Sequence, residues 1–185
     1  MPRRVAVGEL LTELKSFAAR NFPKEEVDAY LSGTLVDEAA LDQYSTYAEE
    51  RYTRHLIHKD EDFELLIICW GSGQGAPIHG HEGELCWARV ERGKLRFSNY
   101  RIVSEKPLRL QPVGEPVDGS TGFLDGPAEI HAVENPVAFG QNAASLHLYS
   151  KPYSECDVYD SLTGPRRRVS LAYDTIHGEP VTTGS

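Results

Sequence analysis

Two histidines separated by one residue are the clearest chemical feature of the sequence, in the stretch PIHGHEGELC at residues 77–86. Because residues i and i+2 of a strand face the same side, His79 and His81 can present both imidazoles to one interior. His131, in EIHAVEN, is predicted to complete a facial triad from across a barrel. Imidazole suits zinc, copper, iron and nickel, so these residues indicate a transition-metal site.

Of the four remaining histidines, one is a candidate for the metal site and three are not. His147, in SLHLYS, is a candidate fourth ligand or a residue that contacts the ligands. His55, His58 and His177 lack any partner pattern, so we expect surface or structural roles for them.

The elements that would position these side chains change character near residue 50. Beyond it, short alternating or apolar runs rich in β-forming residues are separated by turn signals such as GSGQG, ERGK and LDGP. This spacing is typical of a sandwich or barrel. Residues 1–50 instead carry apolar side chains at helical spacing, and Gly33 can end a helix that begins near KEEVDAYL. We therefore predict one domain over 1–185, with helices in 1–50, a β-barrel in 51–175 and a flexible tail in 176–185.

Composition narrows the classes of function. The 185 residues carry 28 acidic and 19 basic side chains, a net charge of −9, which disfavours nucleic-acid binding. The basic run Arg166–Arg168 is too short to reverse this and is expected to be a solvated turn or edge strand. The sequence lacks the run of about 18 apolar residues that a membrane span requires, and its first residues do not resemble a signal peptide. Three cysteines make a disulfide framework unexpected, so we predict a reducing, cytoplasmic location. We also expect a monomer without membrane partners.

The spacing around His79 resembles the first motif of the cupin superfamily. Gly73 precedes His79 by six positions, Cys86 follows His81 by five, and Gly93 follows seven later. Cupins usually place an acidic metal ligand where Cys86 stands. Asn135 follows His131 as in the second cupin motif, although GPAEI before His131 lacks the Pro-x-Gly part.

Loss of the carboxylate ligand has a chemical consequence. Three neutral imidazoles leave Fe(II) with its full double charge and three open coordination positions. Such a centre favours an anionic chelating substrate, for example a thiolate with a neighbouring amine. Glu82 and Glu84 do not lie at the cupin spacing and are expected to be loop or strand residues.

Four separated motifs make the resemblance more specific. YTRHLI, IICWGSGQGAPIHGHEGELCWARVERGKLRF, IHAVEN and SLHLYS occur in the order typical of the cysteine dioxygenase family. The resemblance covers about residues 45–162 and implies a mainly β, cupin-type jelly roll with an N-terminal helical segment. It also implies a cysteine dioxygenase, which oxidises L-cysteine with O₂ to cysteine sulfinic acid at a three-histidine Fe(II) centre.

The resemblance also implies a role for each matching residue. The iron ligands would be His79, His81 and His131. Arg54 would bind the substrate carboxylate through its planar guanidinium, with Tyr52 beside it. Ser145 and His147 would form a relay to Tyr149, and Cys86 with Tyr149 would be the pair that forms a thioether crosslink in part of the family. Cys156 aligns with a family cysteine near the pocket mouth, whereas Trp70 and Trp87 are expected to pack the barrel.

One departure from the family leaves the substrate open. The family often continues after SLHLYS with two prolines, the first in a cis bond, but Lys151 stands between Ser150 and Pro152. A 3-mercaptopropionate dioxygenase is a close second hypothesis, because that relative uses a similar iron site. It usually has Gln at the position of Arg54 and lacks the cysteine at 86, so the sequence favours cysteine on both counts. The residues are also compatible with a non-enzymatic metal-binding cupin and with a zinc-dependent isomerase or carbon-oxidising dioxygenase.

Overall fold

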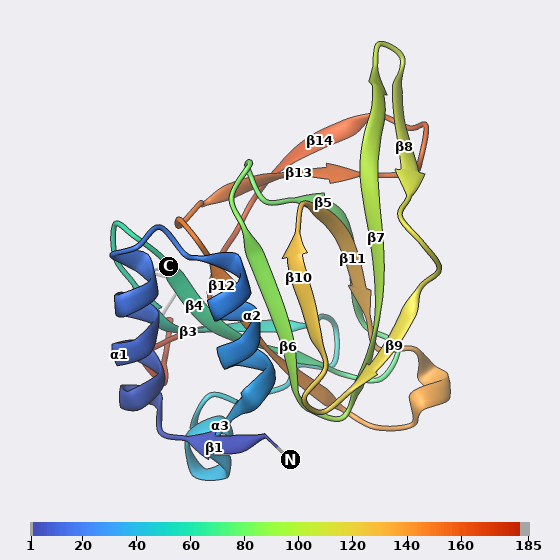
Figure 1. The fold of residues 1–185 in the computed structure, drawn as a ribbon. Coiled ribbons are helices and arrows are strands. Elements are labelled where there is room, and N and C mark those ends of the chain that lie inside the picture. The colour runs from blue at the N-terminus through green and yellow to red at the C-terminus, as the bar shows by residue number, and fades with distance from the viewer. Residues whose placement is uncertain (1, 182–185) are drawn as a thin grey trace.

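Two facing β-sheets with helices on one flank make up most of the protein (Figure 1). The structure is a computed structural model that describes residues 2–181. The first sheet has the strand order β10 (Leu124–Ala128), β6 (Cys86–Arg92), β12 (Ala143–Tyr149), β4 (Glu64–Trp70), β3 (Thr53–Lys59), β15 (Thr175–Ile176), β16 (Glu179–Pro180). The second has the order β14 (Arg166–Ser170), β13 (Glu155–Tyr159), β5 (Gly75–Gly80), β11 (Ile130–Glu134), β7 (Lys94–Glu105), β8 (Leu108–Pro112), and β9 (Val117–Ser120) also pairs with β7. The expected mainly β jelly roll is confirmed, as two sheets rather than a closed barrel.

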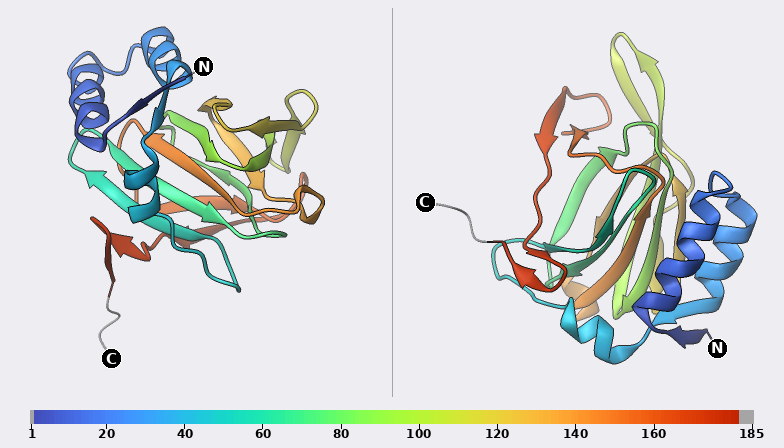
Figure 2. Two further views of the ribbon diagram at one scale, coloured as in Figure 1. Left: turned by 90° about the horizontal axis from the view of Figure 1, so that it is seen from below. Right: turned by 90° about the vertical axis from the view of Figure 1, so that its left-hand side faces the viewer.

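The helices come from the N-terminal part of the chain, as predicted. They are α1 (Val7–Ala18), α2 (Lys24–Gly33) and α3 (Glu38–Gln43), and a short 3-10 turn, η1 (Val137–Phe139), occurs later. Figure 2 shows α1 and α2 side by side against one flank of the sheets. Asp37 begins α3 by accepting a hydrogen bond from the Ala40 backbone N–H.

Alternation along the central strands separates two cores. On β12, Ala144, Leu146 and Leu148 pack toward the helices, in the same apolar cluster as Leu10, Leu14 and Phe17 of α1. The intervening residues belong to the interior between the sheets, and they are Ser145, His147 and Tyr149. Because both faces of β4 and β12 are covered, every residue of the two strands is buried.

A buried ion pair joins the helical layer to the first sheet. The Arg89 Nε donates to Glu91 Oε1 at 2.6 Å, and both side chains are fully buried. Arg89 also donates to the Leu31 carbonyl at the end of α2, at 2.9 Å. Glu91 accepts the backbone N–H of Val36 at 2.9 Å. That N–H lies in β2 (Thr34–Val36), which pairs in parallel with β1 (Arg3–Val5), a pairing the sequence did not predict.

The C-terminal segment differs from the predicted flexible tail. Residues 175–180 form a small hairpin, in which β15 lies parallel to β3 and pairs with β16. His177 donates its backbone N–H to the Leu56 carbonyl at 2.9 Å. Backbone pairing rather than apolar burial anchors this segment, so its polar composition gave no signal. Residues 182–185 of the predicted tail lie outside the described residues. Over residues 2–181, no helix is long and apolar enough to cross a bilayer.

Candidate active site

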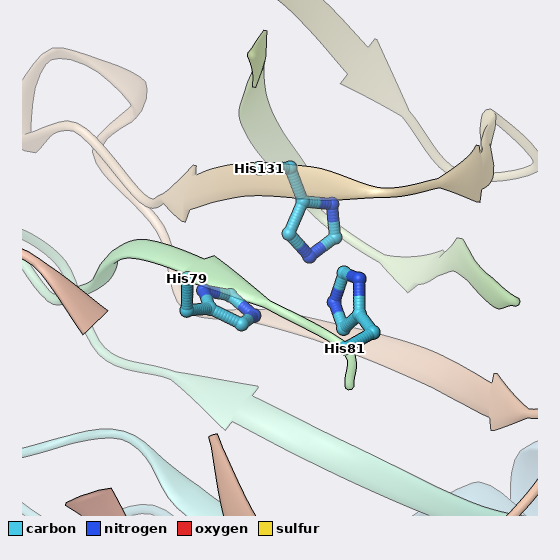
Figure 3. Close-up of side chains that lie close together, drawn as sticks. All are labelled: His79, His81 and His131. Atoms are coloured by element: carbon cyan, nitrogen blue, oxygen red, sulfur yellow. The ribbon is translucent and has the colours of Figure 1, made fainter. Parts of the chain in front are cut away.

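Three histidines converge at one edge of the interior (Figure 3). His79 lies on β5, His81 follows β5 directly, and His131 lies on β11 as the register partner of His79. Their candidate ligand atoms all lie within 4.8 Å of one another. The predicted triad is therefore present, but its members come from adjacent strands of the second sheet rather than from across a barrel, because β11 pairs with β5.

The hydrogen bonds of the three rings fix which nitrogen faces the centre. His79 Nδ1 donates to the Pro77 carbonyl at 2.8 Å, and His81 Nδ1 donates to the Glu129 carbonyl at 3.1 Å. His131 Nδ1 donates to Asp125 Oδ2 at 2.9 Å. An imidazole whose Nδ1 carries the proton presents the Nε2 lone pair as a ligand.

The unpartnered ring nitrogens test whether the residues fit a metal ion. Nε2 of His81 and Nε2 of His131 are buried and find no hydrogen-bond partner among residues 2–181. Buried polar atoms without a partner are rare and costly, whereas coordination of a cation would satisfy both. The donor set therefore fits a metal ion.

Burial keeps two of these imidazoles neutral. It lowers the pKa of His79 to about 3, with a further contribution from the neighbouring His131. The pKa of His81 also falls well below its ordinary value for the same two reasons. Neutral rings retain the lone pairs that metal binding needs.

Asp125 orients His131 and was not identified from the sequence. It lies on β10 of the first sheet, within the LDGP stretch that resembles a turn, and it is 7% exposed. Its other oxygen, Oδ1, accepts from the Asn99 side-chain amide at 2.8 Å. A carboxylate behind a ligand histidine raises its basicity and fixes its ring, so Asp125 completes the site.

A cavity of about 220 Å³ opens beside the histidines. Five of the predicted residues line it, namely Tyr52, Arg54, His79, Tyr149 and Cys156. Arg54 comes from β3 of the first sheet and is 8% exposed. Burial by itself lowers the pKa of the Arg54 guanidinium, but the nearby tyrosines and Glu64 raise it above its ordinary value. A charged guanidinium therefore lines the same cavity as the His79 imidazole.

The three residues predicted to form a relay lie next to one another on β12, and Trp70 contacts the first of them. Trp70 Nε1 donates to Ser145 Oγ at 2.8 Å, and Ser145 Oγ lies 2.9 Å from His147 Nε2. Since the buried hydroxyl hydrogen of Ser145 needs an acceptor, it points to His147 Nε2. His147 then carries its proton on Nδ1, which lies 3.5 Å from the Tyr149 hydroxyl. The phenolic hydrogen of Tyr149 is thereby left for a partner other than His147.

Cys86 and Tyr149 are direct cross-strand neighbours. They are register partners on β6 and β12, and both are buried. Residues so placed have Cβ atoms about 4.5–5.5 Å apart. Burial, with the mutual influence of nearby acidic groups, raises the pKa of the Cys86 thiol and of the Tyr149 phenol. Both groups are therefore protonated at neutral pH.

The histidines without a partner pattern have structural roles, as expected. His55 Nδ1 lies 2.9 Å from Thr175 Oγ1, and His177 Nδ1 donates to the Ile57 carbonyl at 3.0 Å. His58 Nε2 contacts Asp60 Oδ2 at 2.7 Å. Trp87 faces the helical layer and donates to Asp28 Oδ1 at 2.6 Å.

One wall of the cavity comes from residues that sequence reasoning missed. Arg167, Val169 and Leu171, in and just after β14, line it together with Tyr153. The run Arg166–Arg168 does lie on an edge strand, as expected, but its middle residue faces the cavity. The register places Arg167 opposite Val158, and Val158 opposite His79, so all three share a face. The two-residue spacing of Arg167, Val169 and Leu171 was the one signal in the sequence that these side chains share a face.

The chain is similar to several known proteins. The chain matches the family model described as "Cysteine dioxygenase type I" over residues 4–162. Cysteine dioxygenase type 1 of Rattus norvegicus is 31% identical over 188 residues, covering 98% of this chain and 92% of the rat protein. The protein of the same name from Homo sapiens is 29% identical over 165 residues, covering 88% of this chain and 82% of the human protein. A solved structure from Thermus thermophilus covers 60% of this chain and 93% of its own, at 18% identity and a TM-score of 0.48.

The family match spans every residue of the histidine triad, Arg54 and the relay on β12. The three-histidine cluster indicates that a metal takes part. The chain therefore belongs to the cysteine dioxygenase family of the cupin superfamily, whose members are dioxygenases that act on small thiols.

Proposed function

We propose that this protein oxidises L-cysteine with O₂ to cysteine sulfinic acid. The observation that carries the proposal is one small cavity lined both by a buried guanidinium, that of Arg54, and by His79, which belongs to the three-imidazole cluster. L-Cysteine offers a thiolate and an amine for the metal and a carboxylate for Arg54. Both atoms of O₂ are transferred to the sulfur of L-cysteine.

Fe(II) is the metal we assign to His79, His81 and His131. Three neutral imidazoles suit several transition metals, and the family membership favours iron among them. When bound, Fe(II) supplies the redox chemistry that activates O₂ toward a thiolate.

The protein's own residues then bind the substrate, orient it and hold protons beside it. Arg54 grips the carboxylate through two N–H groups, which fixes the direction of the thiol-bearing carbon. The His147 Nδ1–H faces the Tyr149 oxygen, so the phenolic hydrogen can be directed to the reacting atoms. The aromatic and apolar wall formed by Tyr153, Val158 and Leu171 limits the access of water.

The Cys86–Tyr149 pair is proposed to form a thioether crosslink. A carbon–sulfur bond between the thiol and the phenol ring removes two hydrogens, and O₂ is the oxidant. Intact mass measured before and after turnover reports this loss, and a Cys86→Ala variant should not show it.

Oxygen consumption by the iron-loaded protein with L-cysteine tests the activity. The product should gain two oxygens from labelled O₂, and failure to consume O₂ with L-cysteine would refute the proposal. Comparison of L-cysteine with 3-mercaptopropionate, in the wild type and in Arg54→Gln, separates the two thiol dioxygenase activities. We further propose that the protein acts as a cytoplasmic monomer. Sedimentation in solution would check the oligomeric state, and fractionation of cells would check the location.

A further inference from the structure

A carboxylate lies behind the guanidinium that faces the cavity. Glu64, the first residue of β4, is 1% exposed. It is the register partner of Tyr149 on one side and of Lys59 on the other. Neither the metal site nor the relay uses it, and its burial requires compensation because an uncompensated buried charge is costly.

Two cations share this carboxylate. Arg54 Nη2 lies 3.7 Å from Glu64 Oε1, and Lys59 Nζ lies 3.6 Å from Glu64 Oε2. Among residues 2–181, neither Glu64 oxygen has a hydrogen-bond partner, and Arg54 Nε and Nη2 also have none. The two ion pairs are therefore long and lack hydrogen bonds, so a ligand that forms hydrogen bonds with Arg54 can replace Glu64 as its partner.

Lys59 holds its position from the outer side of the protein. Its side chain is 36% exposed, and Nζ donates to the Tyr173 hydroxyl at 3.0 Å. The ring of Tyr173 also lies 5.9 Å from the Arg54 guanidinium carbon. Lys59, Glu64 and Arg54 thus form a row of charges from the surface to the cavity.

The row carries two positive charges and one negative charge. The net charge of the three side chains is therefore +1, which the single carboxylate of a bound substrate would neutralise. Glu64 and that carboxylate must share Arg54, because both are attracted to the same guanidinium. Lys59 attracts Glu64 in the opposite direction and so leaves Arg54 more available.

We propose that Glu64 is a specificity-determining residue that competes with the substrate carboxylate for Arg54, and that Lys59 moderates this competition. The inference rests on the proposed function, in which Arg54 binds a carboxylate. It makes the affinity for carboxylate-bearing thiols adjustable from a position that does not touch the substrate.

The test measures thiol binding to the Fe(II)-loaded protein by calorimetry without oxygen. L-Cysteine and cysteamine share a thiol and an amine, and only L-cysteine has a carboxylate. Glu64→Gln should lower the Kd for L-cysteine by about tenfold, because Arg54 loses a buried competitor. Lys59→Met should raise that Kd by about threefold, the scale of a partly exposed ion pair. Neither change should alter the Kd for cysteamine.

Lys94→Met is the matched control for the lysine substitution. Lys94 Nζ also lies 3.6 Å from a carboxylate, that of Asp118, its side chain is 35% exposed, and it also contacts an aromatic ring, Phe139. It is not among the residues that line the cavity. Its substitution should leave both Kd values unchanged.

Opposite shifts in the two variants, confined to L-cysteine, would support the proposal, since a general loss of structure cannot tighten binding in one variant and weaken it in the other. Equal shifts for cysteamine, shifts in the same direction, or no shift would overturn it. If Glu64→Gln does not fold, the selective weakening in Lys59→Met still decides the question. Arg54→Gln tests the underlying function separately. If it leaves the preference for L-cysteine intact, Arg54 does not bind the carboxylate, whereas a loss of preference without effects at Glu64 and Lys59 refutes this inference alone.

Discussion

At the level of single residues, each histidine of the cluster donates its Nδ1–H to an acceptor that lies outside the His-x-His pair. Pro77, Glu129 and Asp125 accept from the three Nδ1 atoms. Two of these acceptors are backbone carbonyls, which no residue type encodes. Asp125 is the exception, and its side chain can be substituted.

Asp125→Asn should weaken metal binding by about 10–100-fold, the usual effect of losing a carboxylate behind a ligand histidine. The amide is a weaker acceptor for the His131 Nδ1–H, so the ring loses basicity and a fixed orientation. Competition with a chelator measures the affinity. Asp118→Asn, at an exposed ion pair with Arg96, is the control, and an equal loss of affinity in that variant would contradict the prediction.

Ser145→Ala should lower kcat for thiol oxidation by about tenfold, while metal affinity stays unchanged. Without the serine hydroxyl, His147 is free to carry its proton on Nε2, and its contact with the Tyr149 oxygen reverses direction. Steady-state oxygen consumption with metal analysis checks this. A change in KM alone would show that Ser145 affects substrate binding instead. Ser104→Ala, on β7 away from the cavity, is the control.

Residue type and strand spacing indicated the three histidines, whereas the roles of Arg54, Cys86 and the set on β12 came from the resemblance to the family motifs. His79 with His81, and Ser145 with His147 and Tyr149, lie two positions apart, so strand geometry alone places each set on one face. Asp125 and Glu64 could not be identified in this way, because their contacts arise from pairing between distant strands. Their types are also the charged types that most often face solvent.

At the level of elements, the buried pair of Arg89 and Glu91 on β6 connects the sheet to the helices. Strand alternation predicts that Arg89 and Glu91 lie on the same face of β6. It does not explain why two charged side chains lie on the face that the helices cover. The helical layer explains it, since Arg89 satisfies the carbonyl at the end of α2.

Arg89→Met should destabilise the fold by about 3–5 kcal/mol, because it leaves the Glu91 carboxylate buried without its partner. Urea unfolding measures the loss. The double variant Arg89→Met, Glu91→Met should recover a large part of it, since no charge then stays buried. A double variant no more stable than the single one would show that lost packing, not the lone charge, causes the effect.

Asp174 joins the C-terminal segment to β3 in a pH-dependent way. Burial alone raises the pKa of this carboxyl, but hydrogen bonds from Arg51 and from the Arg54 backbone N–H hold it below its ordinary value. A lowered pKa in the folded state adds stability above the unfolded pKa of about 3.9, and the gain is lost as the pH falls through the folded value.

Asp174→Asn should therefore lower the Tm at pH 7 but not below the folded-state pKa of Asp174. Thermal unfolding of both proteins between pH 7 and pH 2.5 tests this, and the two Tm values should converge as the pH falls below about 4. A constant difference across that range would mean that the ionised form of Asp174 contributes nothing. Asp118→Asn again provides an exposed control.

At the level of the whole molecule, the apolar core under the helices and the histidine cluster lie on opposite sides of the first sheet. The sequence predicted N-terminal helices, later strands and the class of fold, because helical and strand periodicities differ. It did not predict that the chain's end would return to pair with β3, since that pairing uses backbone groups. The helical layer packs outside the first sheet, whereas the metal site belongs to the second.

Leu14→Ala should test this division. Leu14 is fully buried in the cluster between α1 and the first sheet, and its truncation should cost about 2–5 kcal/mol. The affinity for metal in the folded protein should stay unchanged, as measured by chelator competition at a temperature well below the Tm. Reduced affinity under those conditions would show that the two sides are coupled.

The wall formed by Arg167, Val169 and Leu171 lies beyond residue 162, where the family match ends. The rat relative nevertheless aligns with 98% of this chain, so the similarity continues beyond the family match. The wall lies on β14, the edge strand of the second sheet, whereas the histidines lie on or directly after β5 and β11 nearer its middle. A substitution at Val169 is therefore expected to change the shape of the cavity while the histidine cluster keeps its geometry.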